Sequence, residues 1–216
     1  MKKIYLPIVA AMFLASCGGN EKPAEQAAEQ PEMQPKEVCM YSYNEESTEV
    51  LWVAYKYTDK VGVKGVFDSI MVEGFSESES PAQVIANAGF TIYTESVNSG
   101  DPTRDPKIRE YFFGKMQNGD QIHGSVKSVS GTETEGKVQF LLTMNGMQQP
   151  IEGTYTVVDD KLEVKAEITV DTWNGSTQLG ELNKVCEDLH KGSDGKSILW
   201  PDVSLFISAK LNKACN

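Results

Sequence analysis

Residues that build catalytic or metal sites are scarce in this chain. His123 and His190 are its only histidines, and they lie in separate segments. No group of His, Cys, Asp and Glu has the spacing of metal ligands, so we expect no zinc site. The Gly-x-Ser-x-Gly turn of serine hydrolases and the glycine-rich phosphate loop are also missing. These absences favour a protein that binds rather than catalyses, and we expect no cofactor.

Positive charge is scarce as well. The 216 residues include 20 Lys and Arg against 31 Asp and Glu, which gives a net charge of −11. An acidic chain repels phosphate backbones, and its few cations form no basic stripe. Nucleic acid is therefore excluded as a partner.

The apolar run near the start, Ile4 to Leu14, is too short to span a bilayer as a helix. It follows Lys2 and Lys3, as in a secretory signal peptide. The sequence Leu14-Ala15-Ser16-Cys17 resembles a bacterial lipobox, which implies cleavage before Cys17 and acylation of that cysteine. The alternative is an ordinary secretory signal that happens to contain a cysteine.

Three regions follow from this interpretation. Residues 1–16 are the expected signal peptide, and residues 17–37 are an expected disordered tether, because Pro, Glu, Gln and Ala dominate there. Residues 38–216 are long enough for one domain with a sizeable core. We expect a protein held to the bacterial cell envelope by acyl chains on Cys17. Gly18, where inner-membrane lipoproteins often have Asp, favours the outer membrane.

Alternating apolar and polar residues predict a mainly β domain. Leu162, Val164 and Ala166 alternate with charged residues, and Asn145-Gly146 is a strong hairpin turn. About eight strands and two or three short helices favour a closed antiparallel barrel or a sandwich. The expected strands are Val50–Tyr57, Val61–Val72, Phe90–Val97, Ile122–Val129, Val138–Met144, Ile151–Val157, Leu162–Val170 and Val203–Leu211.

Three helices are expected between these strands. Proline follows a capping residue at Ser80 and again at Asp105, which predicts helices over Pro81–Ala88 and Pro106–Met116. A third helix is expected over Leu179–His190, ending before Gly192. Arg104, beside the Asp105 cap, either meets a ligand head group or ties the loop.

Past Cys17 the chain has three cysteines, an odd number, so at least one thiol is free or pairs between chains. Cys39 and Cys215 lie at the two ends of the domain, and the first and last strands of a closed barrel are neighbours. We therefore favour a Cys39–Cys215 disulfide over Cys39–Cys186. Cys186 lies on an apolar helix face and is expected to be buried.

Three segments resemble the YceI-like family of exported, lipocalin-like barrels. The first is Gly65-Val66-Phe67, and the second runs from Thr94 through Arg104-Asp105 to Phe112-Phe113. The third is the hairpin from Leu142 to Ile151. The three segments occur in the same order as in the family, and the likeness extends from about Thr48 to Lys210. The chain has Tyr57 and Lys107 where the family often has histidine.

The resemblance implies a closed lipocalin-like barrel of about eight strands that binds a polyisoprenoid or similar lipid in its interior, without catalysis. It also implies a homodimer as a candidate state. The expected ligand-binding residues are Trp52, Phe67, Arg104, Ile108, Phe112, Phe113, Phe140 and Leu142. The alternatives are an envelope scaffold protein with a filled barrel, and a hydrolase with Ser or Asp beside one of the histidines.

The lipid anchor can be tested by replacing Cys17 with Ser. Without acyl chains the mature protein has no expected membrane attachment, because stable anchoring requires them. We expect C17S to move from the membrane fraction to the soluble fraction, as followed by immunoblot. Membrane association equal to that of the wild type would place the anchor elsewhere.

Overall fold

The computed structural model describes residues 37–44 and 47–216. These belong to the unit Glu37–Asn216. The expected signal peptide, the anchor Cys17 and the tether up to residue 36 lie outside the described residues. Within the described part, no helix is both long and apolar enough to cross a membrane.

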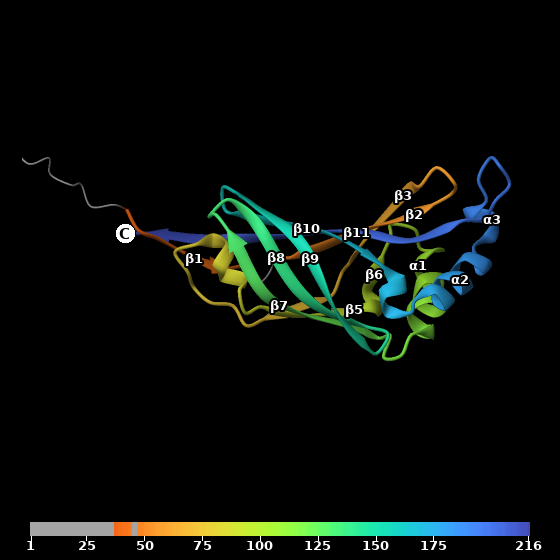
Figure 1. Ribbon diagram of the computed structural model, residues 1–216, viewed down its shortest axis with the longest axis horizontal. Helices are drawn as coiled ribbons and strands as arrows, with labels where there is room; N and C mark the ends of the chain where they lie inside the picture. The colour runs from red at the N-terminus through yellow and green to blue at the C-terminus, as the bar shows by residue number, and fades with distance from the viewer. Residues whose placement is uncertain (1–36, 45–46) are drawn as a thin grey trace, which may run out of the picture. The chain divides into compact units, whose positions relative to one another are not determined.

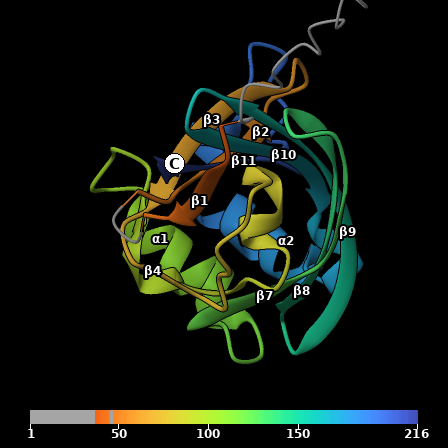
Figure 2. The same cartoon turned by 90° about the vertical axis from the view of Figure 1, so that its left-hand side faces the viewer.

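The fold is mainly β, and a curled sheet of 11 antiparallel strands forms a half-barrel (Figures 1 and 2). The order is β4-β5-β7-β8-β9-β10-β11-β2-β3-β6, and β1 pairs with β11. The strands are β1 Cys39–Tyr43, β2 Glu49–Lys56, β3 Val61–Phe67, β4 Ile70–Glu73, β5 Gly89–Tyr93, β6 Val97–Asn98, β7 Gln121–Gly131, β8 Glu135–Met144, β9 Met147–Val158, β10 Lys161–Thr169 and β11 Leu199–Cys215.

The strand number exceeds the expected eight for two reasons. Two expected strands are each divided: Val61–Val72 becomes β3 and β4, and Phe90–Val97 becomes β5 and β6. The break is held by side chains, since the Ser96 hydroxyl accepts from the Ser69 N–H at 3.0 Å. In addition, β1 was not expected as a strand, and it extends the sheet along the end of β11.

Alternation along the strands sets the two faces of the sheet. Leu162 and Val164 are 3 % exposed, whereas Lys161 and Lys165, which flank this pair, face solvent. Val138 is fully buried in the same way on β8. Every second side chain therefore points into one apolar interior.

Two glycines allow aromatic rings to lie against the wall of that interior. Gly65 is paired with Trp52 across β2 and β3, and a Cβ on Gly65 would be 2.3 Å from the indole Cζ2. Gly124 is paired with Phe90 across β5 and β7, and a Cβ added to Gly124 would be 1.9 Å from Cζ of the Phe90 ring. Any larger residue at either glycine would displace the ring, which explains the glycine of the Gly65-Val66-Phe67 segment.

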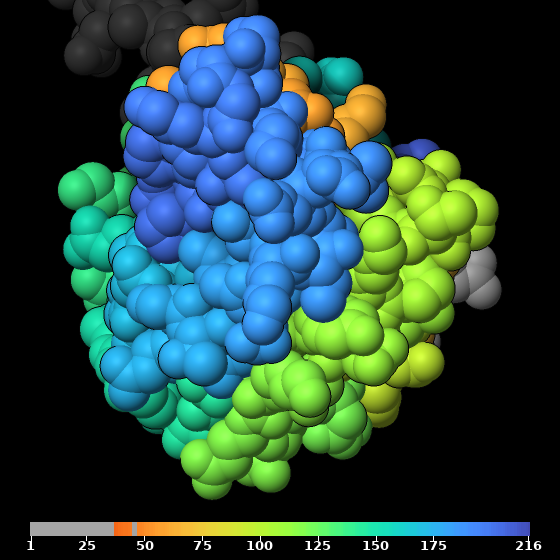
Figure 3. Space-filling view, turned by 90° about the vertical axis from the view of Figure 1, so that its right-hand side faces the viewer, coloured from red at the N-terminus to blue at the C-terminus, as the bar shows by residue number. Residues whose placement is uncertain are grey.

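Helices cover one end of the sheet (Figure 3). They are α1 Asp105–Lys107, a π turn Ile108–Phe112, a 3-10 turn Phe113–Lys115, α2 Ser176–Val185 and α3 Glu187–His190. The expected third helix is thus broken at Cys186. At the other end lies the short 3-10 helix η1 Pro81–Ile85. There are two more 3-10 turns. Thr94–Ser96 joins β5 to β6, and Val170–Trp173 joins β10 to α2.

Asp105 does not cap its helix as expected. The helix begins at Asp105 itself, with Arg104 in the cap position and no side-chain cap bond. The buried Asp105 carboxylate instead accepts two hydrogen bonds from Ser99, at 2.9 Å from its N–H and 2.5 Å from its hydroxyl. The carboxylate therefore fixes the loop before the helix. Its bonds to Ser99 replace the cap bond to the helix backbone that the sequence predicts.

Cys39 and Cys215 form a disulfide, and Cys186 is a free, buried thiol. The two bonded cysteines are the ones that we favoured, and they face one another across the β1–β11 pair. The bond closes a loop with a sequence separation of 176 residues.

Removing this disulfide is expected to destabilise the domain. The entropy of closing so long a loop predicts a loss of up to about 4–5 kcal/mol of unfolding free energy for C39S/C215S. Urea unfolding of the oxidised wild type and the double variant measures the difference. A midpoint unchanged within error would contradict the expected contribution.

Candidate functional site

Three adjoining cavities follow one another through the interior. The sheet cavity lies under the β strands, the helix cavity lies where α2 and the π turn meet the sheet, and the polar cavity lies beyond it, against α2 and α3. The sheet and helix cavities share Phe67, Ile122, Met144, Ile168 and Leu205. The helix and polar cavities share Trp52, Ala54, Ile108, Leu182 and Leu199.

The sheet cavity is almost wholly apolar, with a volume of about 130 Å³. Its outer end lies beside η1, where the rings of Tyr43 and Phe75 stack with centroids 3.6 Å apart. The Tyr43 hydroxyl is hydrogen-bonded to Thr48. The lining includes Tyr43, Val50, Phe67, Phe75, Ile85, Phe90, Phe140, Leu142, Ile151, Leu162, Val164, Ala166, Ile207 and Ala209.

The helix cavity, which also has a volume of about 130 Å³, is lined by apolar side chains that include a cluster of phenylalanines. The Phe113 ring lies 6.0 Å from that of Phe67 and 5.0 Å from that of Phe112, in tilted and edge-on contacts. Phe112 and Phe113 approach together because the π turn inserts an extra residue into the helix at Ile108–Phe112. This turn therefore aims consecutive aromatic residues at the interior.

All eight predicted ligand-binding residues line one of these cavities. Phe140 and Leu142 line the sheet cavity, and Phe67 lies between it and the helix cavity. Ile108, Phe112 and Phe113 line the helix cavity together with Trp52. Arg104 lines the polar cavity. Contact with a ligand stays a prediction for each of them.

The polar cavity, about 120 Å³ in volume, differs from the other two because charged groups line it. Lys56 ends β2 there and donates to the carbonyl of Leu189 at 3.1 Å. Arg104 contributes its guanidinium, with Nη2 3.2 Å from Asp101 Oδ2. Arg104 therefore ties the loop, as one interpretation expected, and it also borders a cavity, whereas contact with a head group stays a prediction.

His190 lies in the polar cavity in its neutral form. Its Nδ1 is 2.8 Å from the side-chain oxygen of Asn183, which also accepts from the Ser197 hydroxyl at 3.1 Å. Burial lowers the pKa of His190 to about 4, and the positive charges of Lys56, Arg104 and Lys107 act in the same direction. At neutral pH the ring therefore carries no charge.

Cys186, in the same cavity, is not an activated nucleophile. Burial raises the pKa of its thiol, although the charges of Lys107, Arg104 and Lys56 act the other way. A thiol that stays protonated at neutral pH reacts slowly. The residue packs as the buried small side chain that its helical position predicts.

One group of potential metal ligands occurs among the described residues, formed by Glu37, Cys39 and Cys215. Both of its sulfur atoms belong to the disulfide, so neither is available as a thiolate.

Lys56 and His190 were missed as site residues by the sequence analysis. Lys56 continues the inward alternation of Trp52 and Ala54, so the period of two could have identified it. His190 gave no such signal, because its position depends on the break of the helix at Cys186.

The pH dependence of stability tests the buried state of His190. Below pH 6.5 the histidine of the unfolded chain binds a proton, whereas His190 of the folded protein binds one only when the pH approaches its pKa of about 4. The unfolding free energy of the wild type should therefore fall between these pH values, and this part of the decline should be missing in H190Q. Urea unfolding from pH 7 to 4 measures both slopes, and equal slopes would contradict the assignment.

Comparison with solved structures supports the fold. A polyisoprenoid-binding domain from Saccharophagus degradans, implicated in plant cell wall breakdown, is 16 % identical, with a TM-score of 0.54 over 80 % of this chain and 98 % of that one. BcnA of Burkholderia cenocepacia is 16 % identical, with a TM-score of 0.55 over 79 % and 99 %. A mutant YceI protein of Campylobacter jejuni is 19 % identical, with a TM-score of 0.52 over 74 % and 89 %.

No curated protein sequence matches the chain. The family model described as the YceI-like domain matches residues 41–198. This range starts earlier than the expected Thr48 and ends just before β11, so it is shifted from the expected limits. The matched range covers most of the chain. It includes the lining residues of all three cavities except those on β11. The chain therefore belongs to the YceI-like family.

Proposed function

We propose that this protein is a non-catalytic carrier that holds one long, apolar, isoprenoid-type lipid chain inside a closed β-barrel. The observation that carries the proposal is the series of adjoining cavities, two of them lined almost entirely by apolar side chains. The S. degradans structure is described as a polyisoprenoid-binding domain, and its likeness supports the same ligand class here.

The pairing at the ends of the sheet supports closure of the barrel. β3 pairs with β6 and β4 pairs with β5, although β3 continues into β4 and β5 continues toward β6. The gap between these pairs is bridged by two backbone hydrogen bonds, Asp68 N to Ser96 O at 3.0 Å and Tyr93 N to Ser69 O at 3.1 Å. With each bent segment counted as one strand and β1 left out, the proposed closed wall would consist of eight strands.

Burial of the lipid supplies the binding energy. Each methylene removed from water contributes about 0.8 kcal/mol, so a long chain binds tightly with few polar contacts. The cavities, at about 130 Å³ each, are smaller than the roughly 300 Å³ of an ordinary ligand pocket. A long lipid therefore has to displace the side chains between them. Met144 is suited to this movement because its unbranched chain adopts many rotamers.

The same small volumes favour a second candidate, an envelope scaffold protein whose barrel is filled by its own side chains. Such a protein would display its outer surface to a partner and hold no ligand. The two candidates differ in whether the interior admits a chain.

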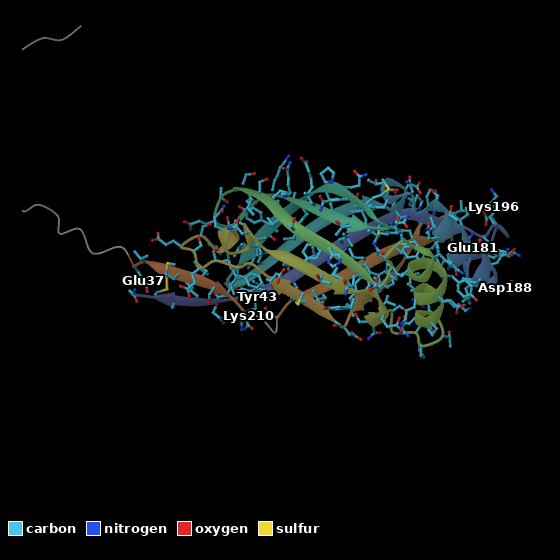
Figure 4. All side chains as sticks on the ribbon, turned by 90° about the horizontal axis from the view of Figure 1, so that it is seen from below. Glu37, Tyr43, Glu181, Asp188, Lys196 and Lys210 are labelled. Carbon is cyan, nitrogen blue, oxygen red and sulfur yellow. A yellow bond between two sulfur atoms is a disulfide. The ribbon has the colours of Figure 1, made fainter. Side chains whose placement is uncertain are left out.

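We also propose that acylated Cys17 holds the carrier at the cell envelope, with the outer membrane favoured by Gly18. The lipobox-like sequence supports this attachment. Glu37, the first described residue, lies at the disulfide end, far from Glu181 and Asp188 on the helices (Figure 4). The polar cavity lies at the helical end of the domain, opposite Glu37.

Filling the sheet cavity distinguishes the candidates. Ala166 faces inward on β10 and is 7 % exposed, so Phe at this position would occupy the space for a lipid tail. We expect A166F to weaken binding of a polyprenol by at least about tenfold, because the ring occupies space for the chain and each methylene left unburied forfeits about 0.8 kcal/mol. Calorimetric titration in detergent gives the dissociation constants.

The matched control is K165F, which places the same ring on the outer face of the same strand. Circular dichroism of both variants reports whether the sheet is retained. Polyprenol binding by folded A166F at wild-type affinity would contradict the carrier. A wild type that binds no polyprenol would favour the scaffold.

A further inference from the structure

We propose that the loop between β4 and β5, residues 74–88, limits the length of the lipid chain that the interior accepts. This end loop contains η1, and three of its residues, Phe75, Ile85 and Ala88, line the sheet cavity. The inference rests on the proposed carrier function and adds to it a maximum number of isoprene units in the ligand.

The position of the end loop is the first argument. Glu73 at the end of β4 pairs with Gly89 at the start of β5, so the loop leaves and re-enters the wall at one place. Its η1 segment, in yellow, lies within the curve of the sheet in the view along the strands (Figure 2). Long loops between paired strands often serve a binding site. The end loop therefore lies across the space that a lipid tail would follow.

The packing behind the lining residues is the second argument. Ala82 is 1 % exposed and Val84 is fully buried, yet neither of them lines the sheet cavity. They belong to a core cluster with Tyr155, Val157 and Leu211, which are also buried and also lie outside the cavity lining. Among the described residues, apolar side chains thus fill the space beyond the end loop, and a tail has no room to pass it.

The attachment of the end loop is the third argument. Ser78 exchanges two backbone hydrogen bonds with Tyr41 on β1, at 2.8 and 3.1 Å, and the Val126 N–H on β7 donates to the Ala88 carbonyl at 2.8 Å. The disulfide joins β1 in turn to β11. A lipid enlarges the interior by displacing flexible side chains such as Met144, whereas the end loop keeps its place. The position of the loop therefore sets the limit.

Phe75 and Ala88 are the residues that can move this limit in opposite directions. The Phe75 ring, which stacks on Tyr43, has about as many carbon atoms as one isoprene unit, so its removal leaves room for about one more unit. Ala88 has the smallest of the three lining side chains, and a leucine there would occupy part of the space for the tail.

The test offers the delipidated protein an equimolar mixture of polyprenols that differ by one isoprene unit, dissolved in detergent. Native mass spectrometry then shows which lengths are bound. The wild type should bind chains up to a limit, and the next longer polyprenol should be bound at least about tenfold less, because its extra carbons leave the detergent for water. F75A should raise the limit by about one unit, and A88L should lower it.

The matched control is F206A, which removes the same ring from the outer face of β11, where Phe206 is 37 % exposed. This variant should keep the wild-type limit. Circular dichroism of all three variants reports whether the sheet is retained, and if one of F75A and A88L does not fold, the other still decides the direction.

The remaining outcomes separate the chain-length limit from the carrier function. Binding of every length without a limit would overturn the role of the end loop and leave the carrier intact. A limit that folded F75A and folded A88L both leave unchanged would overturn that role as well. Binding of no polyprenol of any length would overturn the carrier function, and the limit with it.

Discussion

The contact of aromatic rings with glycines across neighbouring strands determines whether the interior can hold anything. Trp52 lies against Gly65, and Phe90 lies against Gly124, so two of the largest inward side chains occupy the wall instead of the centre. The indole N–H of Trp52 also donates to the Val66 carbonyl at 3.3 Å, which holds the ring along β3. This placement matters because a barrel of about eight strands is only just wide enough for its own side chains or for one small ligand.

The interior changes in character along its length. The η1 end and the middle are apolar, and the end beneath α2 and α3 carries cations beside a neutral histidine. This order matches an amphiphile with a long tail and a small polar head. In the polar cavity the Cys186 thiol stays protonated, and His190 is held by the side-chain amide of Asn183.

The sequence predicted much of the wall and less of its ends. Period-two alternation located the strands and their inward residues, because one face of each strand packs inside and the other meets water. It could not locate the breaks that separate β3 from β4 and β5 from β6, since these depend on contacts such as Ser96 with Ser69, distant in sequence. For the same reason the local capping rule assigned Asp105 to its helix, whereas the buried carboxylate bonds Ser99.

Native mass spectrometry of the protein isolated from the cells that make it tests the central claim most directly. The account predicts discrete adducts whose masses fit isoprenoid lipids, released on denaturation and missing after exhaustive delipidation. It also predicts that adding the isoprenoid back raises the thermal stability of the delipidated protein. Gently purified protein that carries no lipid, together with a melting temperature that added isoprenoids leave unchanged, would contradict the claim.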